Sequence, residues 1–430
     1  MLCLINFGCV SNPYEKGAWR VVRHSEKNNQ ELTFFLNHYK ELGDKEKYAA
    51  ACFLVSNLPG KYAMLSDHML VYDVDIVKSD SLIWSLDYSF ALREQSSFLK
   101  SYSQEQFLEY ILPHRVANEP LEYGWKWDLN KYLNVSSKDI RAAAEEINSQ
   151  IKLDISPKSY GDLPQSYSSL IKNGYGKCDD RTMLVVMALR AMGIPAAYEF
   201  VPYWGSSNNG HSFVSVILPD GMVYPLQNTN KVTMDGYVSR KTPKIYRRMY
   251  ARQENNSFSD SIPELFRYGD LKDVTHLHQI GYSDVSLSEK KITSDGLDYY
   301  LSVFSPNGWI PIAASQDIFF QDIGTGTRFN ENEIPEAEDL GEGILYLPSL
   351  WKQNEVMPVG NPIIVASQGI REIMCDTSCQ VTVKLVRKYP LNYRILNFTK
   401  FMLGGIFEGA NRKDFSDAET LLYSISCACT

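Results

Sequence analysis

The chain has 430 residues, of which 44% are hydrophobic, 22% charged and 12% aromatic, as in a globular protein. This composition excludes a largely disordered chain, which would lack enough apolar residues for a core. The net charge of −8 comes from acidic and basic residues interleaved along the sequence, so no basic stripe could bind the phosphates of nucleic acid. A chain of this length normally folds as two or three domains, and its size allows an enzyme.

The N-terminal stretch "MLCLINFGCVSNPYEKG" changes from an apolar run to a polar, turn-forming sequence at Gly8 and Cys9. It resembles the last part of a bacterial lipoprotein signal, in which the cysteine is lipidated. The resemblance implies export to the periplasm or outer cell surface, membrane anchoring through Cys9, and a start codon placed inside a longer signal. A plain frayed terminus is the alternative. No stretch has the run of about 18 apolar residues that crosses a bilayer.

After a leader and linker at residues 1–24, the pattern at 25–158 is helical, because apolar residues recur at spacings of three and four. We expect Ser103, and either Ser136 or Ser137, to cap helices in this region. The sequence therefore predicts a helical N-terminal region.

A loop between two of these predicted helices contains Arg115 and Asn118, flanked by Pro113 and Pro120. Prolines restrict the backbone, so the loop is expected to be rigid. We predict that it borders an active cleft and that Arg115 and Asn118 bind substrate there. The alternative is a solvated connection without a functional role.

The pattern changes at residues 159–255. A segment that is apolar on nearly every side begins at Cys178, as expected of a buried helix, and ends at Gly193 and Pro195. Alternating segments rich in aromatic and β-branched residues follow, which predicts a helix and then antiparallel strands.

Residues 256–400 show short strand patterns separated by turns, which predicts a β-sandwich or similar all-β domain. Residues 401–430 resemble the opening of a discoidin-like, carbohydrate-binding domain. Such a domain needs on the order of a hundred residues, so we expect a truncated segment. The predicted fold class is α+β.

Cys178 is the candidate nucleophile. A thiol reacts as the thiolate, and its pKa falls at a helix N-terminus and beside an imidazole. Gly174 and Gly176 allow the backbone to turn sharply before the helix, whose amides could hold an oxyanion. Asp179 and Asp180 follow, and their negative charges oppose a thiolate. A histidine would have to outweigh them for Cys178 to ionise at neutral pH.

His211 is the candidate base among seven histidines, because it begins a predicted strand directly after the flexible stretch "GSSNNG". At a strand start its ring can face a cleft while alternating residues anchor the strand. The other six have no comparable neighbours. They are His24, His38, His68, His114, His276 and His278.

These residues together carry a family resemblance. A Gly-x-Cys sequence, a helix ending in "ALRAMGIP", and a later Gly-His strand start with a "DG" turn resemble the transglutaminase-like superfamily, which has a papain-like fold. The likeness covers about residues 160 to 235 and extends more loosely to bacterial lipoproteins of unassigned substrate. The matching residues are Gly176, Cys178, Leu189, Arg190, Gly193, Ile194, Pro195, His211 and Phe213.

The resemblance implies a helix packed against an antiparallel sheet and a catalytic triad. Cys178 would be the nucleophile and His211 the base and then the acid. The position of the usual aspartate is occupied by Gln227, with Asn228 adjacent, and neither amide stabilises an imidazolium as a carboxylate does. Trp204 is expected either to wall the substrate cleft or to pack against its strand.

The leading hypothesis is an exported cysteine-dependent amide hydrolase or acyltransferase that forms a thioester on Cys178. The bond would belong to a peptide, protein or glycopeptide. One alternative is a non-catalytic peptide- or glycan-binding surface lipoprotein with a degraded triad, and another is a structural spacer.

No cofactor and no metal site is predicted, because Cys375 and Cys379 have no second cysteine pair or histidine beside them. Those two cysteines could pair if the chain is exported. Cys52 is expected to be a buried core residue.

Overall fold

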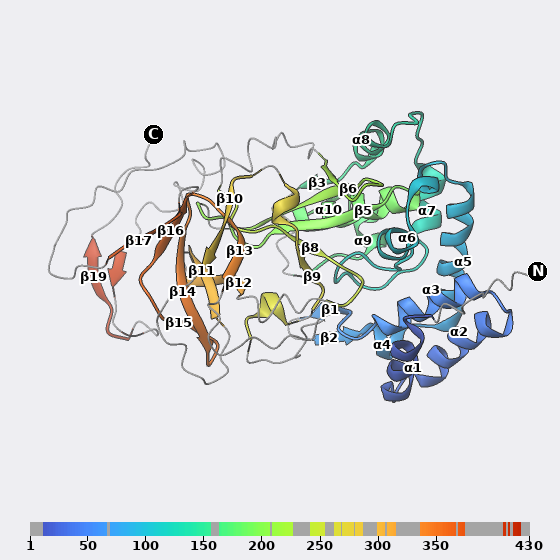
Figure 1. Ribbon diagram of the computed structural model, residues 1–430, viewed down its shortest axis with the longest axis horizontal. Coiled ribbons are helices and arrows are strands. Elements are labelled where there is room, and N and C mark those ends of the chain that lie inside the picture. The colour runs from blue at the N-terminus through green and yellow to red at the C-terminus, as the bar shows by residue number, and fades with distance from the viewer. Residues whose placement is uncertain are drawn as a thin grey trace, which may run out of the picture. The chain divides into compact units, whose positions relative to one another are not determined.

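The computed structural model divides the chain into two compact units, residues 1–374 and 375–430. The first unit contains a helical region, a mixed core and a sheet-rich region in chain order (Figure 1). This order confirms the α+β fold class predicted from the sequence. The structure describes residues 12–66, 69–155, 163–206, 209–226, 241–253, 262–267, 269–278, 280–286, 299–305, 308–314, 336–366, 369–374, 407–409, 412 and 416–422.

The helical region encloses an apolar core of its own, to which α2 contributes Phe35 and α3 contributes the buried Cys52. Helix α1 buries Ala18 and Val22 in the same core. The helical region therefore begins at Glu15 rather than at residue 25, inside the segment predicted as leader and linker. Its elements are α1 (Glu15–His24), α2 (Asn29–Glu41), α3 (Lys45–Ser56), β1 (Tyr62–Ser66), β2 (Met69–Tyr72), α4 (Asp73–Ile76), α5 (Ser79–Gln95), η1 (Phe98–Ser101) and α6 (Gln104–Tyr110).

One of the two predicted helix caps is confirmed. Ser103 caps α6 through a reciprocal capping box with Gln106. Helix α8 is capped instead by Asp139, whose carboxylate accepts from the backbone of Arg141 and Ala142. The prediction of Ser136 or Ser137 was wrong, because an aspartate directly before the helix offers a better-placed acceptor.

The mixed core is built around α10, whose residues from Asp180 to Ala191 are all buried. Helices α7 and α8 and the sheet surround it, which explains an apolar sequence on every side. Gly193 follows at φ 74°, where a Cβ would lie 2.6 Å from Ser96 Oγ, so glycine is needed there. The helices are α7 (Trp125–Tyr132), α8 (Ile140–Gln150), α9 (Tyr167–Asn173) and α10 (Cys178–Ala191), and the short parallel pair is β3 (Asp154–Ile155) and β4 (Tyr175–Gly176).

A five-stranded antiparallel sheet packs against α10 in the order β7-β6-β5-β8-β9. Val214 and Val216 of β6 join the core around α10, whereas Phe213 packs in a separate cluster. Alternate residues of the strand therefore face opposite sides. The strands are β5 (Ala196–Val201), β6 (His211–Ile217), β7 (Val223–Pro225), β8 (Tyr246–Arg248) and β9 (Leu271–Asp273), and η3 (Glu264–Phe266) and η4 (Thr275–Leu277) flank β9.

The sheet-rich region contains a six-stranded antiparallel sheet, in the order β12-β11-β14-β16-β17 with β15 beside β14, and the pair β10–β13. It closely approaches the core at Gly341, where a Cβ would overlap the backbone of Thr242, and at Gly205, which touches Ile344. These contacts leave no room for side chains. The strands are β10 (Tyr282–Ser286), β11 (Tyr299–Ser305), β12 (Gly308–Ala314), β13 (Glu336–Gly341), β14 (Leu345–Lys352), β15 (Glu355–Pro358), β16 (Ile363–Ala366) and β17 (Gly369–Glu372).

In the second unit, the described residues form an antiparallel pair, β18 (Phe407–Gly409) and β19 (Glu419–Leu422). Most of the predicted discoidin-like segment at 401–430 lies outside the described residues, as do Cys9, Cys375 and Cys379.

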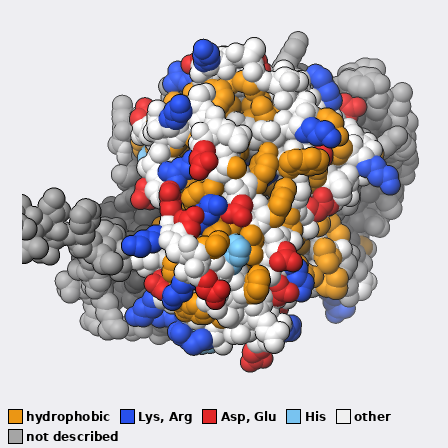
Figure 2. Space-filling model, turned by 90° about the vertical axis from the view of Figure 1, so that its right-hand side faces the viewer, with side chains coloured by type: hydrophobic (Ala, Val, Ile, Leu, Met, Phe, Trp, Pro, Cys, Tyr) orange, Lys and Arg blue, Asp and Glu red, His pale blue; other side chains and the backbone are white. Residues whose placement is uncertain are grey.

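Acidic, basic and apolar side chains are interleaved on the face shown in Figure 2. Within the described ranges, every helix falls short of the length and apolarity that a bilayer crossing requires.

Candidate active site

Cys178 lies at the first position of α10, as predicted. The preceding loop is held by Asp180, whose carboxylate accepts from the backbone of Lys177 at 2.9 Å and of Gln165 at 3.0 Å. A Cβ at Gly176 would lie 2.8 Å from the Asp180 Cβ, so only glycine fits. The local sequence therefore fixes the position of the thiol.

The surroundings of the Cys178 thiol favour its neutral form. Burial and the nearby carboxylate of Asp179 raise the pKa of Cys178 to about 11, although hydrogen bonds from the backbone of Ser212 and Asp179 act in the opposite direction. The Sγ atom donates to Asp179 Oδ1 at 3.7 Å. Burial and Asp179 therefore favour the neutral thiol over the expected thiolate, and the predicted opposition from Asp179 is confirmed.

Asp179 connects the thiol to the sheet. Its Oδ1 atom also accepts from the hydroxyl of Tyr198 at 3.1 Å and from the hydroxyl of Ser212. Tyr198 and Ser212 contact each other at 2.8 Å. Tyr198 comes from β5 and Ser212 from β6, so this network fixes the start of α10 against two strands.

His211 is the first residue of β6, directly before Ser212. Its ring stacks with Trp204 at a centroid distance of 6.2 Å and lies 6.5 Å from Phe213. The hydrogen bonds described for the Cys178 sulfur are with Asp179 and the backbone of Ser212. The structure thus brings the backbone of the predicted histidine's neighbour to the sulfur, while the imidazole packs with aromatic rings.

Trp204 is fully buried, and it packs with Val201 and Phe213 behind His211. Trp204 was expected either to wall a substrate cleft or to pack against its strand, and the structure shows it packed in the apolar cluster. Gln227, the predicted third member of the triad, lies outside the described residues, which continue after β7 only as far as Leu226 before the next gap.

Arg115 does not line the cavity near α10, in contrast to the prediction. Its guanidinium is 2% exposed and makes a bidentate ion pair with the fully buried Asp73, with both contacts at 2.6 Å. It also donates to the carbonyls of Tyr62, Ala117 and Glu119. These partners use the hydrogen-bond donors of the Arg115 guanidinium, so Arg115 stabilises the loop rather than facing the cavity.

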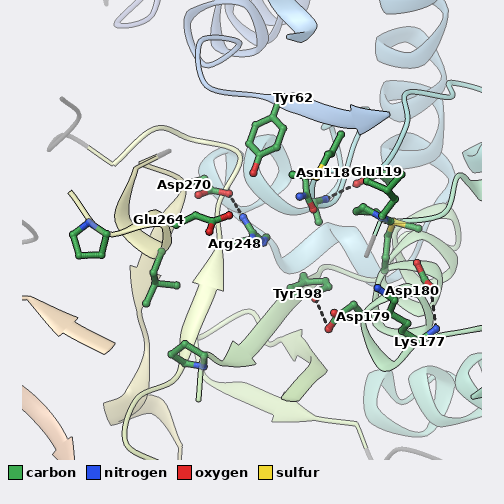
Figure 3. Close-up of a pocket in the computed structure, with 18 of the residues that line it drawn as sticks. Tyr62, Asn118, Glu119, Lys177, Asp179, Asp180, Tyr198, Arg248, Glu264 and Asp270 are labelled. Atoms are coloured by element: carbon green, nitrogen blue, oxygen red, sulfur yellow. Dashed lines mark hydrogen bonds and ion pairs between the residues drawn. The ribbon is translucent and has the colours of Figure 1, made fainter. Parts of the chain in front are cut away.

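A cavity of about 610 Å³ lies beside the start of α10 (Figure 3). It meets the helix at Asp179, and Asn118 from the predicted loop lines another part of the wall. The Cys178 side chain is not among its lining residues. Asp179 therefore contacts the thiol and also lines the cavity. The walls come from the helical region (Tyr62, Met64), the loop (Ala117, Asn118, Glu119), the core (Leu163, Pro164, Lys177, Asp179, Asp180, Met183, Tyr198, Pro202, Arg248, Pro263, Glu264, Leu265, Asp270) and the sheet-rich region (Trp309, Ile310, Pro311, Trp351).

Sequence analysis missed most of this wall. Tyr198 and Arg248 lie on neighbouring strands that are joined only after a long excursion of the chain. Their positions within alternating segments could have indicated a shared face, but not which face it is. In the part of the chain that the structure describes, no group of three or more His, Cys, Asp or Glu side chains could hold a metal ion.

Residues 128–226 match the family model of the transglutaminase-like superfamily. This segment is a transglutaminase-like domain. The match confirms the resemblance carried by Gly176, Cys178 and His211. No curated protein matches the chain.

Among solved structures, the chain is similar to a candidate cysteine protease from Cytophaga hutchinsonii, with 17% identity and a TM-score of 0.20 over 26% of this chain and 37% of that one. It therefore spans little more than a third of that protein. Legionella pneumophila LapG shares 16% identity at a TM-score of 0.20, over 33% of this chain and 71% of LapG. EGTA-treated LapG from the same organism shares 15% identity at a TM-score of 0.22, over 39% of this chain and 84% of that one. Likenesses at this level carry no argument about activity.

Proposed function

We propose that this chain is a cysteine-dependent amide hydrolase or acyltransferase that acts through a thioester on Cys178. The observation that carries the proposal is the contact between the Cys178 sulfur, at the start of α10, and the backbone of Ser212, the residue after His211. The thiol at the start of α10 therefore lies beside the start of β6, the strand that carries His211. A thiol, a histidine and helix amides are the groups that acyl transfer through a thiol requires.

In the proposed reaction, His211 takes the proton of the thiol as the sulfur attacks the amide carbonyl. Backbone amides at the start of α10 stabilise the resulting oxyanion. The carbon–nitrogen bond then breaks, and the imidazolium gives its proton to the leaving amine. Water or a second amine attacks the thioester, which releases the acyl group and returns the proton to the sulfur.

The raised pKa of Cys178 determines when the proton moves. Because burial and Asp179 favour the neutral thiol, the proton is transferred during the attack rather than beforehand. Among the described residues, β7 pairs with β6 at Ser215, Val216 and Ile217, and Leu226 donates to the carbonyl of Val214. In the proposed reaction, the imidazole of His211 rotates away from the aromatic rings and towards the sulfur.

The proposal includes a peptide, protein or glycopeptide as substrate and an exported location with a lipid anchor on Cys9. Its support is the sequence pattern, since Cys9 lies outside the described residues. Substitution Cys9→Ser in the bacterial host would release an anchored protein from the membrane fraction. An unchanged distribution would remove the anchor from the proposal.

A binding protein without turnover is the second candidate function. Two observations favour it: the neutral thiol of Cys178, and a cavity whose lining excludes that side chain. In this function the cavity would hold a peptide without cleaving it.

The deciding experiment incubates the protein with a defined peptide library and identifies new termini by mass spectrometry. A hydrolase is expected to generate termini that disappear with Cys178→Ser and with His211→Ala. Cys52→Ser is the matched control, because that thiol is fully buried in the helical region. Peptides that are bound but left intact by the wild-type protein would overturn the proposed activity and support the binding function.

A further inference from the structure

We propose that the cavity beside α10 is a subsite for a positively charged side chain, that of lysine or arginine, in a peptide ligand. The inference rests on the proposed function for its link to cleavage, but it concerns binding and can be tested separately. The charges of the residues that line the cavity favour such a ligand.

Carboxylates outnumber cations in the cavity wall. Five acidic residues face two basic ones, Lys177 and Arg248. In a partly enclosed cavity this imbalance attracts a cation and disfavours an anion more strongly than it would on an open surface. The acidic residues are Glu119, Asp179, Asp180, Glu264 and Asp270.

Three of these carboxylates are already satisfied by the protein. Glu119 accepts from the backbone of Val116 and Ala117, both at 2.8 Å. Asp180 accepts from the loop before α10. Asp270 forms an ion pair with Arg248 at 2.6 Å, and this pair also offsets the positive charge of Arg248.

Asp179 and Glu264 are the carboxylates left to meet a ligand. Both are exposed. The hydrogen bonds of Asp179 all reach Oδ1, so within the described ranges no donor contacts Oδ2. The carboxylate of Glu264 likewise has no hydrogen-bond or ion-pair partner in the described part of the chain, although its backbone carbonyl accepts from Arg267. Figure 3 shows the two residues on opposite sides of the cavity, with Tyr198 and Arg248 between them.

Aromatic side chains complete the wall and suit the same ligand. Tyr62, Tyr198, Trp309 and Trp351 all line the cavity. Aromatic faces bind ammonium and guanidinium groups, and the aliphatic stem of lysine or arginine packs on apolar surface. A volume of about 610 Å³ accommodates such a side chain with part of its backbone.

The location of Asp179 adds a consequence for catalysis. Its carboxylate lies 3.7 Å from the Cys178 sulfur and also lines the cavity. A cation bound beside Asp179 would offset the negative charge that opposes formation of the thiolate. A basic substrate would thereby promote ionisation of the thiol that attacks it.

The test measures binding by isothermal titration calorimetry with the full chain. The probes are acetyl-Gly-Arg-Gly-amide and acetyl-Gly-citrulline-Gly-amide, which have nearly the same shape but differ in charge. We expect the arginine peptide to bind about tenfold more tightly, because hydrogen bonds to charged partners are worth more than neutral ones. Glu264→Gln should weaken arginine binding about fivefold and leave citrulline binding unchanged. Glu94→Gln, an exposed residue of α5, is the control with the same loss of charge.

Equal affinities for the two peptides, or an arginine affinity that is unchanged in Glu264→Gln, would overturn the subsite. The proposed function is judged separately by the peptide-library experiment. Cleavage without preference for arginine would reject the subsite and keep the hydrolase. Selective arginine binding without any cleavage would keep the subsite and reject the hydrolase.

Discussion

A single carboxylate, Asp179, links the thiol, the sheet and the cavity. Together with burial it raises the pKa of Cys178 to about 11. It also accepts hydrogen bonds from the hydroxyls of Tyr198 and Ser212. The first turn of α10 would otherwise favour a thiolate. The identity of one residue therefore determines how the neighbouring thiol must be activated.

We predict that Asp179→Asn lowers the pKa of Cys178. Loss of the negative charge removes one cause of the raised pKa and leaves burial in place, so the pH profile of iodoacetamide labelling should shift to lower pH. Labelling at pH 7 should become about tenfold faster, which corresponds to about one pKa unit. Mass spectrometry of the Cys178 peptide provides the measurement. Asp80→Asn, an exposed residue of α5, should leave the profile in place. An unmoved profile for Asp179→Asn would mean that burial alone controls the thiol.

Sequence reasoning placed Cys178 at a helix start and His211 at a strand start, because both kinds of start leave local signals. It also identified the opposing charge of Asp179, which is adjacent in sequence. The protonation state could not be predicted, since both the burial of Cys178 and its hydrogen bond with the backbone of Ser212 arise only when distant parts of the chain pack together. The packing of His211 with Trp204 has the same origin.

At the scale of elements, the loop that carries Asn118 is held by a buried ion pair. The sequence predicted a rigid loop beside an active cleft, because paired prolines are local signals, and in the structure Asn118 of this loop lines the cavity. It assigned Arg115 to substrate, because its partner Asp73 lies 42 residues away and is invisible to local patterns. With Arg115 held in the buried pair, Asn118 is the residue of this predicted pair whose side chain lines the cavity.

We predict that Arg115→Met destabilises the protein by about 3–5 kcal/mol, because it leaves the carboxylate of Asp73 buried without its main partner. Urea unfolding followed by fluorescence measures this free energy. Arg20→Met, in an exposed position of α1, should change it by less than about 0.5 kcal/mol. A small effect at Arg115 would show that water or His114 replaces the guanidinium.

The sheet contains a second buried cluster, in which Glu199 of β5 contacts Arg247 at 2.7 Å and His278 at 2.9 Å. Burial raises the pKa of Glu199, but Arg247 and His278 overcome this effect and lower it to about 2. A lowered pKa contributes stability that is complete above the carboxyl pKa of the unfolded chain, about 4.3. This contribution is lost as the pH falls through the folded value.

We therefore predict that the free energy of unfolding falls between about pH 5 and pH 2, and that Glu199→Gln reduces the slope in this range. Urea unfolding at a series of pH values measures both. Glu94→Gln should leave the slope as it is in the wild-type protein. An equal slope for Glu199→Gln would place the acid sensitivity elsewhere, for example at Asp73, whose pKa is also lowered to about 2, because Arg115 and His114 outweigh its burial.

At the scale of the whole first unit, the cavity is a product of three regions. Its wall runs from Tyr62 in the helical region to Trp351 in the sheet-rich region. The sequence predicted the regions and their order, because periodicity and turns are local. It could not predict the cavity, which exists only where the regions pack together, as at Gly341 against Thr242. In the proposed function, the outer regions would help to select the ligand, while the transglutaminase-like domain carries the candidate nucleophile.

This division of roles predicts separable effects. Trp309→Ala, in β12, should weaken binding of acetyl-Gly-Arg-Gly-amide about fivefold, as expected for loss of a cation–π contact. It should not alter iodoacetamide labelling of Cys178, because Trp309 lines the cavity and makes no contact with the thiol. Trp127→Ala, at a half-exposed position of α7 outside the cavity, is the matched control and should change neither quantity. Slower labelling in Trp309→Ala would instead mean that the sheet-rich region supports the fold of the core, and the effect on binding would then be indirect.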